Sequence, residues 1–223
     1  MSHLNGRLIH AQEAARAKIA RELHDGVCQE LACVSLAISG LKRSSGHIQD
    51  VRTQATLSEL EQSVCNTIEG LRRLSHDLHP AVLQLLGLVT ALEAHCLEVE
   101  QRHDVQVGFQ AIGAFDGIHP DISLCLFRIA QETLRNGAVH GRARRLGLSI
   151  VRTATEIELI VFDDGQGFDL EAVRREGRGL GLVSMEERAH LAGGEVEIAT
   201  RPGQGTSIGV RVPVVLPFLR TGT

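Results

Sequence analysis

Apolar residues recur every three or four positions through residues 1–80, which is the spacing of one face of an α-helix. The first such run extends from about Leu8 to Arg43 without a proline, and Ser44-Ser45-Gly46 then breaks it. The second run extends from Val51 to Leu78, and Pro80 ends it because proline disfavours helix at the residue before it. The pattern predicts two helices joined as a hairpin. The apolar stripe of the first helix is predicted to be Ile19, Leu23, Val27, Leu31, Val34, Ile38 and Leu41.

After Pro80 the pattern changes to a mixture of helical and alternating spacing. The pattern predicts a linking helix at 81–102, a strand at Val105 to Phe109 and a second helix at 121–140. It predicts a last helix at Leu182 to Ala192. Four further strands are predicted at 146–152, 156–162, 195–200 and 206–212. We therefore predict a multi-domain chain. An all-α hairpin occupies residues 1–80, and an α+β two-layer sandwich with helices over one face of a mainly antiparallel sheet occupies residues 81–223.

The hairpin has an apolar stripe on each helix and no third layer to cover it. Two helices cannot enclose an apolar core on their own, so we expect two chains to pair their hairpins into a dimeric four-helix bundle. The sequence therefore predicts a homodimer.

Composition and charge exclude several classes of protein. With 43% hydrophobic residues among 223, the chain can fill buried cores and is not a disordered tail. A net charge of -4, with basic residues scattered among acids, gives no footprint for direct nucleic-acid or anionic-membrane binding. The five cysteines include no Cys-x-x-Cys pair, so we interpret them as reduced packing residues. No run of eighteen apolar residues exists, and Met1 to Arg7 lacks the core of a secretory signal, which predicts a soluble, cytoplasmic chain.

A histidine stands beside a carboxylate in the first predicted helix. His24 and Asp25 are predicted to project toward solvent beside the apolar stripe. A neutral imidazole can act as a nucleophile near neutral pH, and a neighbouring carboxylate can hold its reactive tautomer. His24 is thus a candidate phosphate acceptor with Asp25 as its partner, although such a pair alone is more often a solvated helix face. Gln29 lies four residues after Asp25 and could orient a water molecule.

Two glycine-rich segments lie downstream, Asp164-Gly165-Gln166-Gly167 and Gly177-Arg178-Gly179-Leu180-Gly181-Leu182. Such turns let the backbone approach a nucleotide closely. Asp164 is predicted to accept a hydrogen bond from the exocyclic amine of adenine, where guanine carries a carbonyl. The second segment opens a helix whose first amides favour phosphate. The polar stretch between them, Asp169 to Arg178, is interpreted as a mobile lid.

Glu132 and Asn136 are spaced i, i+4 on one predicted helix. A carboxylate and an amide on one helix face can hold Mg²⁺ against triphosphate oxygens, because magnesium prefers oxygen ligands. The alternative is an ordinary pair on a helix surface.

Six segments, in order, carry a resemblance to the sensor histidine kinases of bacterial two-component systems. They are the acceptor segment Ala20 to Gln29, Leu71 to Pro80 followed by Leu86-Gly87-Leu88, Gln131 to Asn136, the two glycine-rich segments, and Gly205-Thr206. The acceptor segment resembles the subgroup that pairs with NarL-type response regulators. The resemblance covers nearly the whole chain, although no single segment is decisive.

The resemblance implies a dimerisation and phosphotransfer domain at 1–80 and, at 81–223, a Bergerat-type ATP-binding domain of the gyrase, histidine kinase and MutL superfamily. It implies ATP and Mg²⁺ as cofactors, autophosphorylation of His24, and transfer of the phosphate to an aspartate of a NarL-type regulator with a helix-turn-helix output domain. DNA would then be a downstream target and not a ligand. The implied catalytic residues are His24, Asp25, Gln29 and Glu132, the implied metal site is Asn136 with Glu132, and the implied nucleotide-binding residues are Asn136, His140, Asp164, Gly165, Gly167, Gly179, Leu180, Gly181, Leu182 and Thr206.

The resemblance also assigns Gln29 a role in dephosphorylating the regulator. One departure concerns Val139 before His140, where related kinases often carry a lysine or arginine, so Arg142, Arg144 or Arg145 is expected to supply that phosphate contact. Two alternatives stay open: a nucleotide-binding phosphatase or scaffold without autokinase activity, and an ATPase switch like gyrase or MutL. Membrane attachment is expected only if the chain is part of a longer membrane-bound kinase.

Overall fold

The computed structural model describes residues 2–44, 51–78, 81–177 and 179–215. The chain divides into two compact units: Arg7–Ala81, and Met1–Gly6 with Val82–Thr223. We call the first the hairpin unit and the second the sheet unit, and each is described by itself. The fold class predicted from the sequence, a helical N-terminal region followed by an α/β sheet domain, is confirmed.

The hairpin unit contains α1 (Ser2–Glu22), the turn η1 (Leu23–Val27), α2 (Cys28–Ser44) and α3 (Val51–Leu78). The prediction of one regular first helix is wrong at η1, which is a π-helical turn: the backbone N–H of Cys28 donates to the carbonyl of Leu23, five residues earlier. The helix also starts at Ser2, before the predicted Leu8. The wide turn adds one residue to the helix at the segment that carries His24.

Among the described side chains of the hairpin unit, few are buried. Ala20, Cys28, Ile68 and Ser75 are buried, and the Ser75 hydroxyl donates to the Ala20 carbonyl at 2.9 Å. Near the other end, Lys42 Nζ lies 2.6 Å from Glu61 Oε2. These contacts join the first helix to α3 on both sides of η1.

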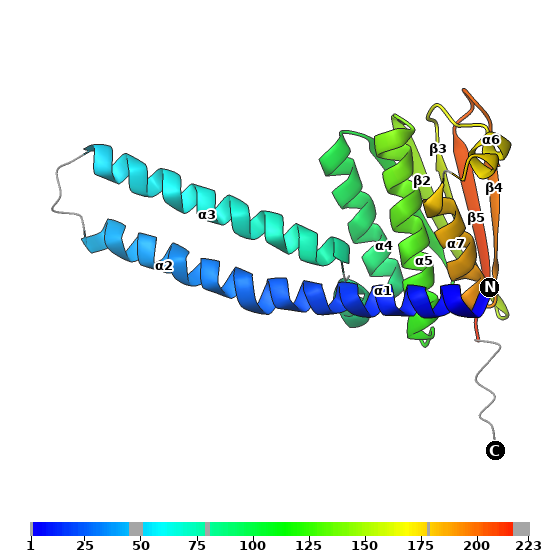
Figure 1. The fold of residues 1–223 in the computed structure, drawn as a ribbon, viewed down its shortest axis with the longest axis horizontal. Coiled ribbons are helices and arrows are strands. Elements are labelled where there is room, and N and C mark those ends of the chain that lie inside the picture. Colours follow the sequence, from blue (N-terminus) through cyan, green and yellow to red (C-terminus); the bar gives the residue numbers. More distant parts are fainter. Residues whose placement is uncertain (1, 45–50, 79–80, 178, 216–223) are drawn as a thin grey trace, which may run out of the picture. The chain divides into compact units, whose positions relative to one another are not determined.

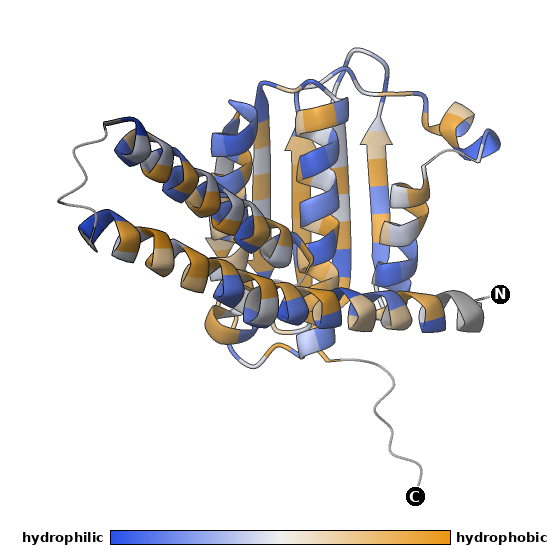
Figure 2. Ribbon diagram, turned by 60° about the vertical axis from the view of Figure 1, so that its left-hand side comes forward, coloured by the Kyte–Doolittle hydropathy of each residue, from blue (hydrophilic) through white to orange (hydrophobic). Residues whose placement is uncertain are grey.

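Part of the apolar stripe predicted to be buried is exposed within one chain. Ile19 is 46% exposed, Val27 41%, Val34 46% and Leu41 56%. Val27, Val34 and Leu41 are spaced seven residues apart, whereas Ile19 precedes Val27 by eight, and the extra residue of η1 accounts for the longer step. Figure 2 shows apolar residues distributed along both helices of the hairpin. We call Ile19, Val27, Val34 and Leu41 the exposed stripe.

The sheet unit contains a five-stranded sheet with strand order β1-β2-β3-β5-β4. Only β1 and β2 are parallel, and the other neighbouring pairs are antiparallel. Helices α4, α5 and α7 cover one face of this sheet (Figure 1), as the predicted two-layer arrangement requires. The strands are β1 (Gln106–Ile112), β2 (Arg145–Arg152), β3 (Glu156–Asp163), β4 (Glu195–Thr200) and β5 (Thr206–Pro213).

The helices of the sheet unit differ from the prediction in three places. Helix α4 (Ala81–His103) is interrupted at Gly87, whose φ of 83° favours glycine. Helix α5 (Pro120–Arg135) ends in a second π-helical turn, η3 (Asn136–His140). Helix α6 (Leu170–Arg175), for which no helix was predicted, precedes α7 (Leu180–Leu191) and lies in the segment interpreted as a mobile lid.

Helix α4 supplies much of the core of the sheet unit. Within the described part of the chain, Val82–His103 is long and apolar enough to cross a membrane by length and composition alone. Its residues Leu88, Leu92 and Val99 are buried in the hydrophobic core with β2, β3 and α5, whereas Leu85, Leu86 and Leu97 are exposed. Burial raises the pKa of Cys96 and that of Cys125 to about 12, so both thiols stay protonated at neutral pH, in keeping with their interpretation as packing residues.

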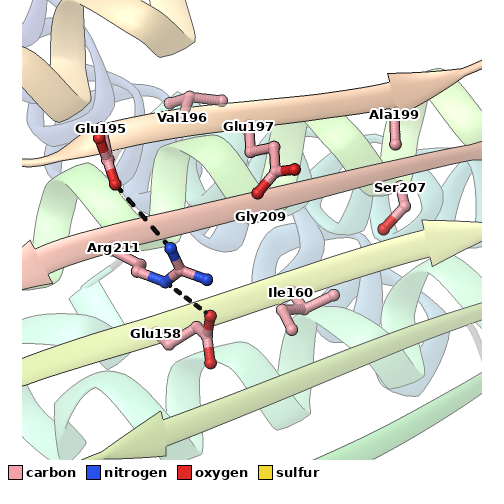
Figure 3. A pocket seen from close by; sticks show the side chains of 9 residues that line it. All are labelled: Glu158, Ile160, Glu195, Val196, Glu197, Ala199, Ser207, Gly209 and Arg211. Carbon is pink, nitrogen blue, oxygen red and sulfur yellow. Dashed lines mark hydrogen bonds and ion pairs between the residues drawn. The ribbon is translucent and has the colours of Figure 1, made fainter.

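The other face of the sheet carries outward side chains of β3, β4 and β5 (Figure 3). Arg211 Nε donates to Glu158 Oε1 at 2.9 Å, and Arg211 lies 3.9 Å from Glu195 Oε1. A hollow of about 470 Å³ lies over the small residues Ala199, Ser207 and Gly209. None of the segments predicted to bind nucleotide contributes to this hollow, so the candidate site lies elsewhere.

Candidate active site

A cavity of about 250 Å³ lies in the sheet unit where α5 and η3, the loop after β3, the lid and β5 meet. Its lining combines apolar side chains with a few polar ones and with glycine backbone, a typical composition for a small-molecule site. Of the predicted nucleotide-binding residues, Asn136, His140, Gly167, Gly179, Leu182 and Thr206 line it. The other lining residues are Thr133, Gly137, Gly141, Asp163, Gln166, Phe168, Val173 and Ile208.

The prediction that the Asp164 carboxylate faces the nucleotide and accepts a hydrogen bond from adenine is wrong. Its Oδ1 accepts the backbone N–H groups of Arg144 and Arg145 at 2.8 and 2.9 Å, and its Oδ2 accepts the Arg145 guanidinium at 3.1 Å. These bonds hold its carboxylate at the base of β2, and Asp164 does not line the cavity. Arg145 therefore already has a carboxylate partner, although it was one of the arginines expected to contact phosphate.

Asp163, one residue earlier, is the carboxylate that lines the cavity. It is buried, and its Oδ1 accepts the Gly165 backbone N–H at 2.8 Å. Burial raises the pKa of Asp163, while hydrogen bonds from Gly165 and from the backbone and hydroxyl of Thr206 act against that rise. The pKa of Asp164 falls to about 2, chiefly because the backbone N–H groups of Arg145 and Arg144 stabilise its ionised form. The pKa values of these two adjacent carboxylates are thus shifted in opposite directions.

A sequence signal for Asp163 existed. Strand β3 buries alternate residues, and Ile157, Leu159 and Val161 all face the core. Continuing this two-residue period places Asp163 on the same inner face and Asp164 outside it. The prediction missed Asp163 because it ended the strand at Phe162.

Glycines bring the loops of the cavity into direct backbone contact. Gly167 has a φ of 55°, and a side chain there would collide with the carbonyls of Arg201 and Gly205. A Cβ on Gly137 would lie 2.7 Å from Leu146 Cδ2 and 3.2 Å from Asp163 Oδ2. Both glycines are therefore needed for the shape of the cavity.

Glu132 and Asn136 meet at the end of α5, as their spacing predicted. Asn136 Nδ2 donates to Glu132 Oε1 at 3.4 Å, and a Cβ on Gly181 would lie 2.6 Å from that same carboxylate oxygen. The bond uses the amide nitrogen, so the amide oxygen of Asn136 can still serve as a ligand beside the carboxylate. A carboxylate and an amide oxygen fit Mg²⁺ when phosphate oxygens and water complete its shell.

The lid contributes an apolar residue that the sequence did not suggest. Asp169 caps α6 by accepting the Ala172 N–H at 3.0 Å, and Val173 of this helix lines the cavity. Arg174 donates to Glu186 of α7 at 2.7 Å. Arg178, at the predicted end of the lid, lies outside the described residues.

The first residues of α7 follow the lid in the sequence and contact it. Gly179 has a φ of 100° and lies against Val173, and the N–H of Leu182 donates to the Gly179 carbonyl at 2.9 Å. Leu180 is 82% exposed and does not line the cavity, and Gly181 faces Glu132 instead. Gly165 is likewise absent from the lining but anchors Asp163 through its N–H. The glycines thus shape the site more than they line it.

The acceptor segment lies in the hairpin unit, and its backbone forms η1. The side chain of His24 lies outside the described residues. Asp25 and Gln29 are exposed. π-helical turns inside α-helices often occur at functional sites, and here the turn coincides with the predicted acceptor.

Comparisons with known proteins bear on both units. A histidine kinase family model matches residues 15–83, and a model of the histidine kinase-, DNA gyrase B-, and HSP90-like ATPases matches residues 122–216. The chain is 31% identical over 208 residues to the signal transduction histidine-protein kinase/phosphatase DegS of Brevibacillus brevis, covering 93% of this chain and 53% of DegS. It is 37% identical over 197 residues to the sensor histidine kinase MctS of Rhizobium johnstonii, covering 85% of this chain and 41% of MctS.

The chain therefore spans about half the length of the curated relatives it matches. Among solved structures, the histidine kinase domain of the blue-light activated histidine kinase from Erythrobacter litoralis EL346 superposes with a TM-score of 0.49 at 15% identity. That superposition covers 83% of this chain and 94% of the other. A similarity this low bears on neither the fold nor the function.

Proposed function

We propose, from the premise that this chain belongs to the histidine kinase family, that it is a kinase core which phosphorylates His24 from ATP. The observation that carries the proposal is the cavity in which Asp163, Thr206 and Asn136 converge among apolar and glycine residues. Together with a histidine in an exposed helical segment, it supplies a donor site and an acceptor. The phosphate would then pass to an aspartate of a response regulator.

The adenine end of ATP is assigned to Asp163 and Thr206. Asp163 would accept a hydrogen bond from the exocyclic amine of adenine, a donor that guanine lacks at that position. Apolar neighbours such as Phe168 and Ile208 line the same cavity and exclude water from this bond. The site therefore favours adenine over guanine.

The phosphate end of ATP is assigned to the other side of the cavity. Glu132 and Asn136 would hold Mg²⁺, which neutralises charge on the phosphates when bound. Gly179 and the first amides of α7 would bind phosphate oxygens. His140 also lines the cavity.

In the phosphorylation step, one ring nitrogen of neutral His24 attacks the γ-phosphorus with its lone pair. The N–P bond forms as the bond from phosphorus to the bridging oxygen of ADP breaks, and ADP leaves with that electron pair. Asp25 would accept a hydrogen bond from the other ring N–H and stabilise the positive charge that develops on the ring.

Gln29 is assigned to the dephosphorylation of the response regulator. Its amide is exposed close to the acceptor segment and cannot itself act as a nucleophile. It could orient water toward the aspartyl phosphate of the regulator, which fits the similarity to DegS, a histidine-protein kinase/phosphatase. We further propose a NarL-type regulator with a helix-turn-helix output, on the ground of the acceptor segment.

Dimerisation is proposed through the exposed stripe. Ile19, Val27, Val34 and Leu41 would be buried against a second copy of the hairpin, which completes a four-helix bundle. We expect this part of the chain to work in the cytoplasm, where ATP and response regulators are present.

Radiolabelled phosphate transfer tests the proposal. The chain is incubated with Mg²⁺ and γ-labelled ATP beside His24→Gln and the control His103→Gln, which alters a histidine of α4 outside the cavity. We expect label that is lost in acid and kept in alkali for the wild type and the control, and none for His24→Gln. Bound ATP without label in the wild type would contradict autophosphorylation, and turnover that survives His24→Gln would indicate an ATPase.

A further inference from the structure

Thr200, the last residue of β4, joins three segments that surround the adenine end of the cavity but does not line the cavity itself. Its Oγ1 accepts the backbone N–H of Phe168 at 3.1 Å. The one proton on the same oxygen can be donated either to the Gly205 carbonyl at 3.0 Å or to Thr206 Oγ1 at 3.2 Å. One hydroxyl therefore connects the residue after the glycine-rich turn, the β4–β5 turn and the first residue of β5.

The hydrogen-bonding capacity of a hydroxyl sets the direction of this network. Each threonine has one proton to donate and two lone pairs to accept with. Thr206 also bonds Asp163 through its hydroxyl. When Asp163 is ionised it accepts only, so the Thr206 proton is directed to the carboxylate and Thr206 Oγ1 accepts the Thr200 proton. When the Thr206 proton points elsewhere, Thr200 bonds Gly205 instead.

We propose that Thr200 is a positioning residue for adenine recognition, acting through Thr206 on Asp163 and through the Phe168 N–H on the apolar wall of the cavity. The inference rests on the proposed function and extends it to a residue outside the cavity. Thr200 accepts from Phe168 on one side and supplies a proton to Thr206 on the other. Its loss would leave the Thr206 hydroxyl and the Phe168 backbone free to move away from adenine.

The test replaces Thr200 with valine, which keeps the shape and removes the hydroxyl. The matched control is Thr153→Val. Thr153 lies in the β2–β3 turn, at the opposite end of β3 from Asp163, and its hydroxyl likewise bonds a carbonyl and two backbone N–H groups. Dissociation constants for Mg-ADP and Mg-GDP are measured by calorimetry on the full chain.

We expect Thr200→Val to weaken ADP binding roughly five- to tenfold, the effect of losing about one hydrogen bond. GDP binding should change little, so the preference for adenine over guanine falls. Thr200→Ser should restore the wild-type preference, and Thr153→Val should keep it. In autophosphorylation the KM for ATP should rise while the rate at saturating ATP stays the same.

Several outcomes would overturn the inference. Unchanged ADP binding in Thr200→Val would do so, and so would an equal loss of ADP and GDP binding, which would indicate a general structural role. If Thr200→Val does not fold, Thr200→Ser and Thr200→Ala give the same comparison. A wild-type chain that binds no adenine nucleotide would overturn the proposed function and this inference together, whereas wild-type binding with no effect of Thr200→Val overturns the inference alone.

Discussion

The two units bury their apolar residues to very different extents. The sheet unit has a continuous core of buried side chains from α4, α5, α7 and the sheet. In the described part of the hairpin unit, the buried apolar residues are Ala20, Cys28 and Ile68, while the exposed stripe stays open. The sheet unit thus buries its apolar side chains within one chain, whereas the hairpin unit leaves an exposed stripe that the proposed second copy would cover.

The largest loss of stability should come from creating a cavity in the core of the sheet unit. Leu92 of α4 is fully buried, and Leu92→Ala should lower the free energy of unfolding of this unit by about 2–5 kcal/mol, because it removes buried contacts and leaves a cavity. Leu97, also in α4 but 53% exposed, is the control and should change it by less than about 0.5 kcal/mol. Native-state hydrogen exchange, read peptide by peptide, measures each unit separately. Equal effects of the two substitutions would contradict a closed core.

The next effect concerns the exposed stripe. Val34→Glu places a charge in the proposed dimer interface and should weaken dimerisation by about 1.5–3 kcal/mol for each chain, the value of one buried aliphatic side chain. Leu36→Glu is the control, since Leu36 is also exposed but lies about 200° further around the helix. Sedimentation equilibrium measures both. A dimer that tolerates Val34→Glu as well as Leu36→Glu would mean that another surface joins the two copies.

A smaller effect is expected where the hairpin unit does bury a polar contact. Ser75→Ala removes the buried bond to the Ala20 carbonyl and should cost about 0.5–1.5 kcal/mol, with faster amide exchange in η1. Ser58, also in α3, makes the same kind of bond to the Gln54 carbonyl on the exposed surface. Ser58→Ala should change exchange in η1 very little. If both variants behave alike, the bond of Ser75 does not stabilise the wide turn.

The sequence predicted those parts of the fold that follow from simple periods. The two-residue and 3.6-residue periods gave the strands of the sheet and the main helices, and the spacing of Glu132 and Asn136 correctly brought them together. The capping residue Asp169 before Leu170 was a further signal for α6, but the charged composition favoured a loop.

The π-helical turns could not be predicted in this way. Ala20 and Cys28 lie eight residues apart, on either side of η1, and both are buried. The wide turn lets both side chains be buried, and that burial depends on tertiary packing. Similarly, the role of Thr200 depends on hydrogen bonds to residues five or more positions away, which no local pattern contains. Local periods therefore predict the elements, and tertiary contacts decide the detail at both candidate sites.

The smallest effects on stability should come from the two adjacent carboxylates of the sheet unit. The folded state lowers the pKa of Asp164 to about 2 from an ordinary value of 3.8, so the ionised form stabilises the fold above about pH 4, and this stability is lost as pH falls toward 2. Asp163 has the opposite sign: its raised pKa means that ionisation costs stability at neutral pH, and stability is gained as pH falls through its folded value.

The opposite pKa shifts predict opposite changes in melting temperature when each carboxylate is replaced by an amide. At pH 7, Asp164→Asn should lower the melting temperature slightly and leave ADP binding intact, since Asp164 is outside the cavity. Asp163→Asn should raise the melting temperature while abolishing ADP binding, because its carboxylate is kept for ligand recognition at the expense of stability. Thermal unfolding followed by circular dichroism from pH 7 toward pH 2 gives both melting temperatures, since the chain has no Trp or Tyr for fluorescence, and calorimetry measures ADP binding. Shifts of the same sign would show that the two carboxylates are not in distinct environments.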